Sequence, residues 1–148
     1  MRGVSGKLRV VLDTKPLIRL FAGEEGWEAV KEIMSRVEAG EMEAGISVVT
    51  LTEIYYKYLR EGRRDLAEAR TEQLRYAIYL KKLALSEEDA VKAGRLKGQY
   101  NVSIADAFIA ASAHSEGAII VSDDPDFKKI SEIKTLTEME LHRRLQSQ

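Results

Sequence analysis

The amino-acid sequence predicts an α/β protein, a three-layer α/β/α sandwich built on a five-stranded parallel sheet. Short segments rich in β-branched residues alternate with longer segments whose apolar residues recur at helical spacing. Strands that alternate with helices form parallel sheets covered by helices on both faces. The chain has 148 residues, which suits one domain spanning residues 1–148. We expect residues 1–7, ahead of the first strand, to be a flexible N-terminal tail.

Start and stop signals divide the chain into these elements. Pro16 suits the first turn of a helix that follows the first strand and ends near Gly23. Ser86 with Asp89 fits the capping box that opens a helix running to about Gln99. In chain order we expect strands at 8–12, 44–50, 82–86, 118–122 and 133–136, and helices at 15–23, 24–40, 50–62, 65–80, 86–99, 103–117 and from 137 onward.

The composition restricts the kinds of site that the protein can build. Because the chain has no cysteine, disulfides and thiolate metal sites are excluded, and two histidines argue against a His-rich metal site. Any metal would be held by oxygen ligands, which favours Mg²⁺ or Mn²⁺ over Zn²⁺. The net charge of −1 argues against a strongly basic nucleic-acid binder. Without a signal peptide or a membrane-spanning apolar run, we expect a cytoplasmic protein with no membrane partner.

Acidic residues follow the predicted strands. Asp13 comes directly after the first strand, and Asp124 comes after the strand at 118–122. Glu53 and Asp106 fall in the first turns of two predicted helices. In an open parallel sheet, ligands bind beyond the carboxyl ends of the strands. The sequence therefore predicts that acids from four distant segments meet at one edge of the sheet.

Each acid also has a structural interpretation. Thr50 with Glu53, and Ser103 with Asp106, fit capping boxes, and Asp124 precedes a proline as turn residues often do. Taken singly, capping or turn formation is the simpler account of Glu53 and Asp124. Taken together, carboxylates about 4 Å apart repel by roughly 4 kcal/mol at an effective dielectric of 20. A divalent cation relieves this repulsion and can promote phosphodiester cleavage.

The sequence resembles the PIN domain, and within it the small prokaryotic VapC-type toxin ribonucleases. The resemblance extends from about residue 8 to the final helix. Its last segment follows the Ser/Thr-x-Asp-x-Asp-Phe run of the family. Four segments carry it: VLDT with Asp13, TLTEIYY with Glu53, SIADAFIAASA with Asp106, and IIVSDDPDF with Ser122, Asp124 and Asp126.

The resemblance implies an acidic pocket that binds Mg²⁺ or Mn²⁺ and cleaves RNA. Asp13, Asp106 and Asp124 match the metal-binding acids of the family, and Glu53 matches a fourth that acts directly or through water. Asp126 matches an outer-shell acid of the same metal site. Ser122 is expected to donate a hydrogen bond to a neighbouring carboxylate, and Thr14 and Lys15 are expected to support the site or contact substrate.

The resemblance also implies partners and a biological role. VapC-type proteins usually pair with a VapB antitoxin and form homodimers. The expected function is therefore a metal-dependent endoribonuclease, the toxin of a VapBC-type toxin–antitoxin pair. The alternative is a catalytically weak or inactive PIN-like module that binds RNA or protein.

Lys15 departs from the family pattern, which usually has Ser or Asn at this position. Its ammonium could offset the carboxylates, contact a substrate phosphate or compete with the metal. The plain alternative is a solvated lysine at a helix start. An aspartyl-phosphatase would need a second Asp at this position, so Lys15 argues against that class.

The segment YYKYLREGRR mixes aromatic and basic residues. Lys57, Arg60 and Arg64 fall near one helical stripe, which could contact RNA through phosphates and stacked bases. Tyr55 and Tyr58 share a helical face with apolar residues, so they are better interpreted as core or interface.

Overall fold

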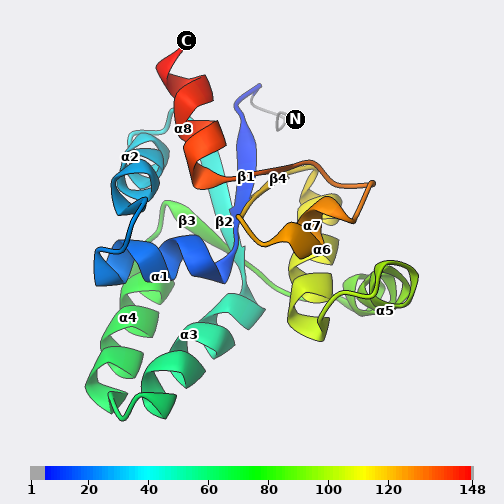
Figure 1. Ribbon diagram of the computed structural model, residues 1–148, viewed down its shortest axis with the longest axis horizontal. Helices are drawn as coiled ribbons and strands as arrows, with labels where there is room; N and C mark the ends of the chain where they lie inside the picture. Colours follow the sequence, from blue (N-terminus) through cyan, green and yellow to red (C-terminus); the bar gives the residue numbers. More distant parts are fainter. Residues whose placement is uncertain (1–5, 148) are drawn as a thin grey trace.

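A five-stranded sheet forms the centre of the protein, and all of its strand pairs are parallel (Figure 1). The computed structural model describes residues 6–147, so the tail expected at residues 1–7 lies almost entirely outside the described residues. In the central ladders Val11 pairs with Gly45 on one side and with Ile120 on the other. The strands, in spatial order, are β3 (Leu80–Leu83), β2 (Glu43–Ser47), β1 (Arg9–Leu12), β4 (Ile119–Val121) and β5 (Thr135–Leu136).

Helices cover both faces of the sheet, which confirms the predicted three-layer α/β/α sandwich (Figure 1). Successive β1 residues point to opposite faces, so that Val10 and Leu12 join one core cluster and Val11 joins the other. The first face carries α1 (Thr14–Ala22), α2 (Trp27–Glu38), α3 (Val48–Arg60), α4 (Arg64–Tyr76) and α8 (Glu138–Gln146). The second face carries α5 (Glu87–Tyr100), α6 (Ile104–Glu116) and the short α7 (Pro125–Lys128).

Three element boundaries differ from the sequence-based expectation. The strand expected at 44–50 ends at Ser47, because the Ser47 hydroxyl accepts a hydrogen bond from the Val49 amide (3.2 Å) and caps α3. The β-branched segment Val48-Val49-Thr50 is therefore helical, although such residues favour a strand. The helix expected at 65–80 ends at Tyr76, and the strand expected at 82–86 lies at Leu80–Leu83. The predicted capping box of Ser86 is confirmed.

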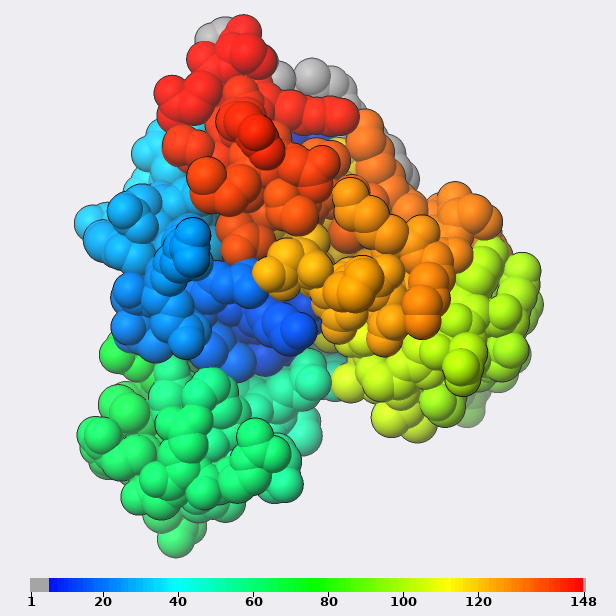
Figure 2. Space-filling view, viewed as in Figure 1, coloured from blue at the N-terminus to red at the C-terminus, as the bar shows by residue number. Residues whose placement is uncertain are grey.

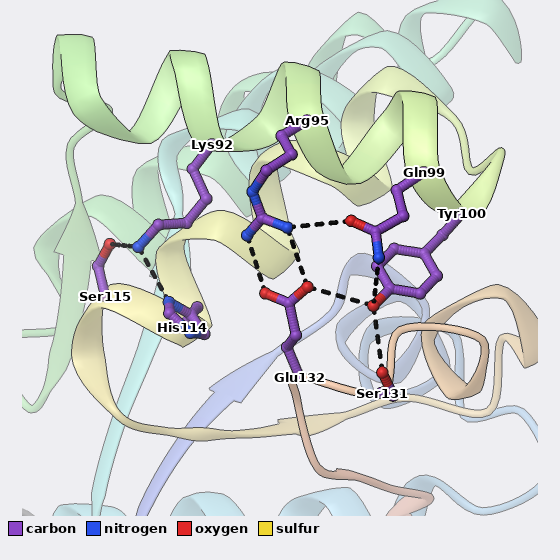
Figure 3. A network of polar contacts seen from close by, with 8 residues as sticks. All are labelled: Lys92, Arg95, Gln99, Tyr100, His114, Ser115, Ser131 and Glu132. Carbon is purple, nitrogen blue, oxygen red and sulfur yellow. Dashed lines mark hydrogen bonds and ion pairs between the residues drawn. The ribbon is translucent and has the colours of Figure 1, made fainter.

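A polar network connects α5 to α6 and to the loop that follows α7 (Figure 3). Arg95 donates two hydrogen bonds to Glu132, at 2.9 and 2.8 Å, and the Tyr100 hydroxyl donates a third at 3.2 Å. Nearer the start of α5, Lys92 lies 2.9 Å from Nδ1 of His114 on α6. Because Tyr100 ends α5 just before α6 begins, and Glu132 follows α7, the network ties together two segments that carry acids.

None of the helices within residues 6–147 is long and apolar enough to cross a membrane.

Candidate active site

The acids predicted from the sequence line one cleft of about 590 Å³ at the carboxyl ends of the strands. In Figure 2 the surface is indented between the lobe of α3 and α4 (green) and the lobe of α5 and α6 (yellow-green). Because β1 lies between β2 and β4, the segments that follow these three strands converge here. The predicted site residues that line the cleft are Asp13, Thr14, Lys15, Glu53, Asp106, Asp124 and Asp126.

Three carboxylates form the tightest acidic group among the described residues. One oxygen from each of Asp106, Asp124 and Asp126 lies within 4.8 Å of the other two. Asp106 stands in the first turn of α6, where the Ser103 hydroxyl accepts a hydrogen bond from its amide (3.1 Å). The Asp124 carboxylate caps α7 by accepting a hydrogen bond from the Asp126 amide (3.0 Å). Turn and cap geometry therefore brings these acids together, so their structural and functional interpretations are compatible.

Asp13 is buried beneath this group, with only 4% of its surface exposed. The Ser122 hydroxyl donates a hydrogen bond to Asp13 Oδ2 (2.7 Å), which confirms the contact expected from the sequence. The same hydroxyl accepts a hydrogen bond from the Asp124 amide (3.0 Å). Ser122 thus joins the end of β1 to the turn after β4 and holds both acids in place.

Glu53 reaches the cleft from α3, and its role differs from the capping box suggested by the sequence. Because α3 begins at Val48, Glu53 lies in the second turn and Thr50 is not the cap. The Thr14 hydroxyl donates a hydrogen bond to Glu53 Oε1 (2.6 Å) and lies 3.2 Å from the Thr50 hydroxyl. A threonine of α1 therefore orients the glutamate of α3.

Most of the negative charge in the cleft has no counter-charge among the described residues. Asp126 forms an ion pair with Lys129 (2.8 Å), whereas Asp13, Glu53, Asp106 and Asp124 form none within residues 6–147. Burial raises the pKa of Asp13 to about 6, against the opposing effect of the Ser122 hydrogen bond. Burial, followed by the charges of Asp124 and Asp13, raises the pKa of Asp106 to about 7. Carboxylates with raised pKa values take up protons or a cation to relieve the repulsion. This all-oxygen donor set fits Mg²⁺ or Mn²⁺.

Lys15 lines the cleft but does not neutralise its acids. The side chain is exposed, and within residues 6–147 it forms no hydrogen bond or ion pair. Its ammonium therefore does not take the place of a metal among the carboxylates. It remains available at the rim of the cleft.

Arg19 is a supporting residue that sequence reasoning did not find. It extends from α1 and forms ion pairs with Asp123, beside the acidic turn, and with Glu138 at the start of α8. Glu138 is buried, and its Oε2 atom has no hydrogen-bond partner among the residues that the structure describes. The partners of Arg19 lie 104 and 119 residues away along the chain, so no local pattern could have revealed them.

A known protein family and solved structures match the segments that form this cleft. The family model described as PIN domain matches residues 10–133. No curated protein matches the sequence significantly. Solved structures match nearly the whole chain at low sequence identity, so they show similarity of fold.

Three of these structures come from different organisms. VapBC-1 from nontypeable Haemophilus influenzae gives a TM-score of 0.72 at 17% identity, covering 89% of this chain and 99% of that chain. VapBC2 from Rickettsia felis, bound to a promoter DNA fragment, gives a TM-score of 0.70 at 15% identity and covers 88% of this chain and 98% of that chain. PAE2754 from Pyrobaculum aerophilum gives a TM-score of 0.63 at 22% identity and covers 95% of this chain and 91% of that chain.

Proposed function

The chain belongs to the PIN domain family, and from this premise we propose that it is a metal-dependent endoribonuclease, the toxin of a VapBC-type pair. The observation that carries the proposal is the convergence of carboxylates from four segments, with the oxygens of Asp106, Asp124 and Asp126 within 4.8 Å of one another. PIN domains are generally nucleases that use divalent metals, which supports this use of the cleft.

In this proposal the cleft acids have distinct roles. Asp106, Asp124 and Asp126 hold Mg²⁺ or Mn²⁺ together with Asp13, whose burial keeps its carboxylate fixed. When bound, the ion would neutralise charge on the phosphodiester and lower the pKa of a bound water. Glu53 completes the set and, held by Thr14, orients the attacking water by accepting its hydrogen bond.

Cleavage assays with acid-to-amide variants test this function. We expect the purified protein to cut RNA in Mn²⁺ or Mg²⁺ and to stop in EDTA. Asp13→Asn and Asp106→Asn should each reduce cleavage at least 100-fold, because an amide is a poor ligand for a hard cation. Asp65→Asn is the matched control, since Asp65 is an exposed carboxylate paired with Arg63 outside the cleft. Undiminished cleavage by both cleft variants would reject the mechanism.

A second candidate is a PIN-like module that binds RNA or protein without cutting. The observation that favours it is the ammonium of Lys15 at the cleft, which has no partner among the described residues, at a position where the family usually has Ser or Asn. Calorimetric titration with Mn²⁺ distinguishes the two candidates. The nuclease should bind Mn²⁺ at millimolar concentration or below, and Asp106→Asn should abolish that heat. A wild-type protein without such binding would support the binding module.

We also propose a VapB-type antitoxin as a partner, and a homodimer as the assembly. Support comes from solved neighbours described as VapBC proteins. An apolar groove of about 450 Å³ between α3 and α4, lined by Leu51, Tyr55, Tyr56, Leu59 and Thr71, offers a surface for such contacts. The test is to add the purified small protein encoded by the neighbouring reading frame and to measure RNA cleavage. Cleavage that stays unchanged would argue against an antitoxin, and light scattering would report the assembly.

A further inference from the structure

Different elements contribute acidic and basic side chains to the lining of the cleft. The α6 and α7 segments contribute Asp106, Asp124 and Asp126. On α1 and α3 the lining includes three basic side chains and one aromatic ring, and none of these was needed to build the acidic site. We call this second group the α3 ledge; its members are Lys15, Tyr56, Lys57 and Arg60.

Within residues 6–147, Tyr56 has no hydrogen bond or core contact that explains its position, and it lies where the cleft meets the apolar groove on α3. Its neighbours have such contacts, because the Tyr55 hydroxyl donates a hydrogen bond to Glu68 of α4 (2.8 Å) and Tyr58 is buried in the core. Tyr56 is 58% exposed and belongs to neither core cluster. An aromatic ring exposed to this extent in a polar cleft is available to a ligand.

The Arg60 guanidinium lies beside the Tyr56 ring. The distance from the guanidinium to the centre of the ring is 5.3 Å, and Arg60 lies one helical turn further along α3. Among residues 6–147 the Arg60 side chain forms no ion pair or hydrogen bond, whereas Lys57 pairs with Glu61. The ring and the guanidinium are therefore held together while both remain free to contact a ligand.

The ledge extends outward from the acids along α3. Glu53, Tyr56 and Arg60 are three and four residues apart, so they lie on one face of the helix and span about 10 Å along its axis. A strand whose phosphate lies at the carboxylates would pass along this face. Lys15 on α1, which has no ion-pair partner in the part of the chain that the structure describes, supplies a further positive charge at the same cleft.

We propose that Tyr56 and Arg60 form a stacking platform for a nucleobase of single-stranded RNA next to the phosphate held at the acidic cleft, with Lys15 contacting the backbone. Single strands fit best, because unstacked bases can lie on aromatic rings and arginine planes whereas bases inside a duplex cannot. The inference rests on the proposed function in that RNA is the ligand, and it adds where and how the strand is held.

Binding is measured in Mn²⁺ with the Glu53→Gln protein, which keeps the aspartates proposed to hold the metal but lacks the carboxylate proposed to orient the attacking water, so that cleavage does not destroy the probe. The probe is a fluorescein-labelled 12-nucleotide single-stranded RNA of mixed sequence, followed by fluorescence anisotropy. Adding Tyr56→Ala should weaken binding about 10- to 100-fold, as the loss of one base–aromatic stack does. Tyr56→Phe should retain the wild-type affinity, because stacking needs the ring and not the hydroxyl.

The control is a similar pair elsewhere on the protein. Tyr76 is 69% exposed and has the Arg75 guanidinium 6.0 Å from its ring centre, but it does not line the cleft. Tyr76→Ala should leave the affinity unchanged. Arg60→Ala and Lys15→Ala should each reduce the slope of log affinity against log salt by about one.

An RNA of the same length without bases separates stacking from general attraction. Tyr56→Ala should have no effect on the affinity for this probe. Three results would each overturn the platform. The first is an equal loss of affinity for both probes in Tyr56→Ala, and the second is an equal loss of affinity in Tyr56→Ala and Tyr76→Ala. The third is a changed oligomeric state in Tyr56→Ala with unchanged RNA affinity. If wild type cuts no RNA but these binding results hold, the nuclease proposal fails and the platform stands.

Discussion

Replacing Asp106 by Asn should make the metal-free protein more stable while removing its metal site. Burial and the charges of Asp124 and Asp13 raise the pKa of Asp106 from 3.8 to about 7. One pKa unit corresponds to about 1.4 kcal/mol, so the ionised carboxylate carries a penalty of at most about 4 kcal/mol. Because the side chain opens onto the cleft, solvent screening reduces this to about 1–2 kcal/mol. An amide of the same shape avoids that penalty.

The stabilisation should depend on pH in a defined direction. The folded protein binds the Asp106 proton more tightly than the unfolded chain does, so the free energy of unfolding of wild type falls as pH rises. This fall should occur between about pH 4 and pH 7, the ordinary and the raised pKa values. The advantage of Asp106→Asn should therefore grow across that window and stay constant above it.

Thermal unfolding in EDTA at pH 5 and pH 8 measures the effect. For a domain of this size, 1–2 kcal/mol corresponds to a rise in Tm of about 2–8 °C at pH 8. Adding Mn²⁺ should raise the Tm of wild type and leave that of Asp106→Asn unchanged. Asp65→Asn is the control, because Arg63 lowers the pKa of Asp65 to about 2. Removing a carboxylate that is favoured in its ionised form should not stabilise the protein. If Asp106→Asn were less stable than wild type at pH 8 in EDTA, the inferred repulsion would be wrong.

Two further substitutions test the supports of the site. Ser122→Ala removes the hydrogen bond to buried Asp13, so urea unfolding should show a loss of about 1–3 kcal/mol and calorimetry a weaker affinity for Mn²⁺. Wild-type values in both measurements would contradict the role of Ser122. Arg19→Gln breaks the ion pairs with Asp123 and buried Glu138, and should cost about 2–4 kcal/mol by leaving a carboxylate without its counter-charge. Adding Glu138→Gln should recover part of that loss, and a double variant less stable than Arg19→Gln would refute the account.

Part of the site was predictable because it depends on local rules. Asp13 follows a buried strand, and parallel strands bring their carboxyl ends to one edge, so the position of Asp13 follows from chain order. The cap by Ser103 and the turn at Asp124 follow from residue types and spacing. The capping interpretation of Thr50 and Glu53 was wrong because Ser47, three residues earlier, competes for the same helix start. Two cap candidates within one helical turn of each other cannot be ranked by propensity alone.

Other features depend on contacts that no local pattern encodes. Asp126 was expected in an outer position, yet one of its carboxylate oxygens lies within 4.8 Å of an oxygen of Asp106 and of Asp124. Tyr56 and Tyr58 are two residues apart and alike in propensity, but the packing of α3 buries one and leaves the other at the cleft.

The sequence by itself determined the alternation of strands and helices, the presence of acids at strand ends and the absence of thiolate ligands, since periodicity, caps and composition can be read without the fold. The tertiary structure decided which acids meet. The order β3-β2-β1-β4-β5 places the end of β1 beside the end of β4, so Ser122 reaches Asp13 across 109 residues of chain. It also gave Arg19 its two distant partners and left Lys15 without one among residues 6–147. Pairings of this kind arise from the packing of whole elements, and short-range patterns carry no information about them.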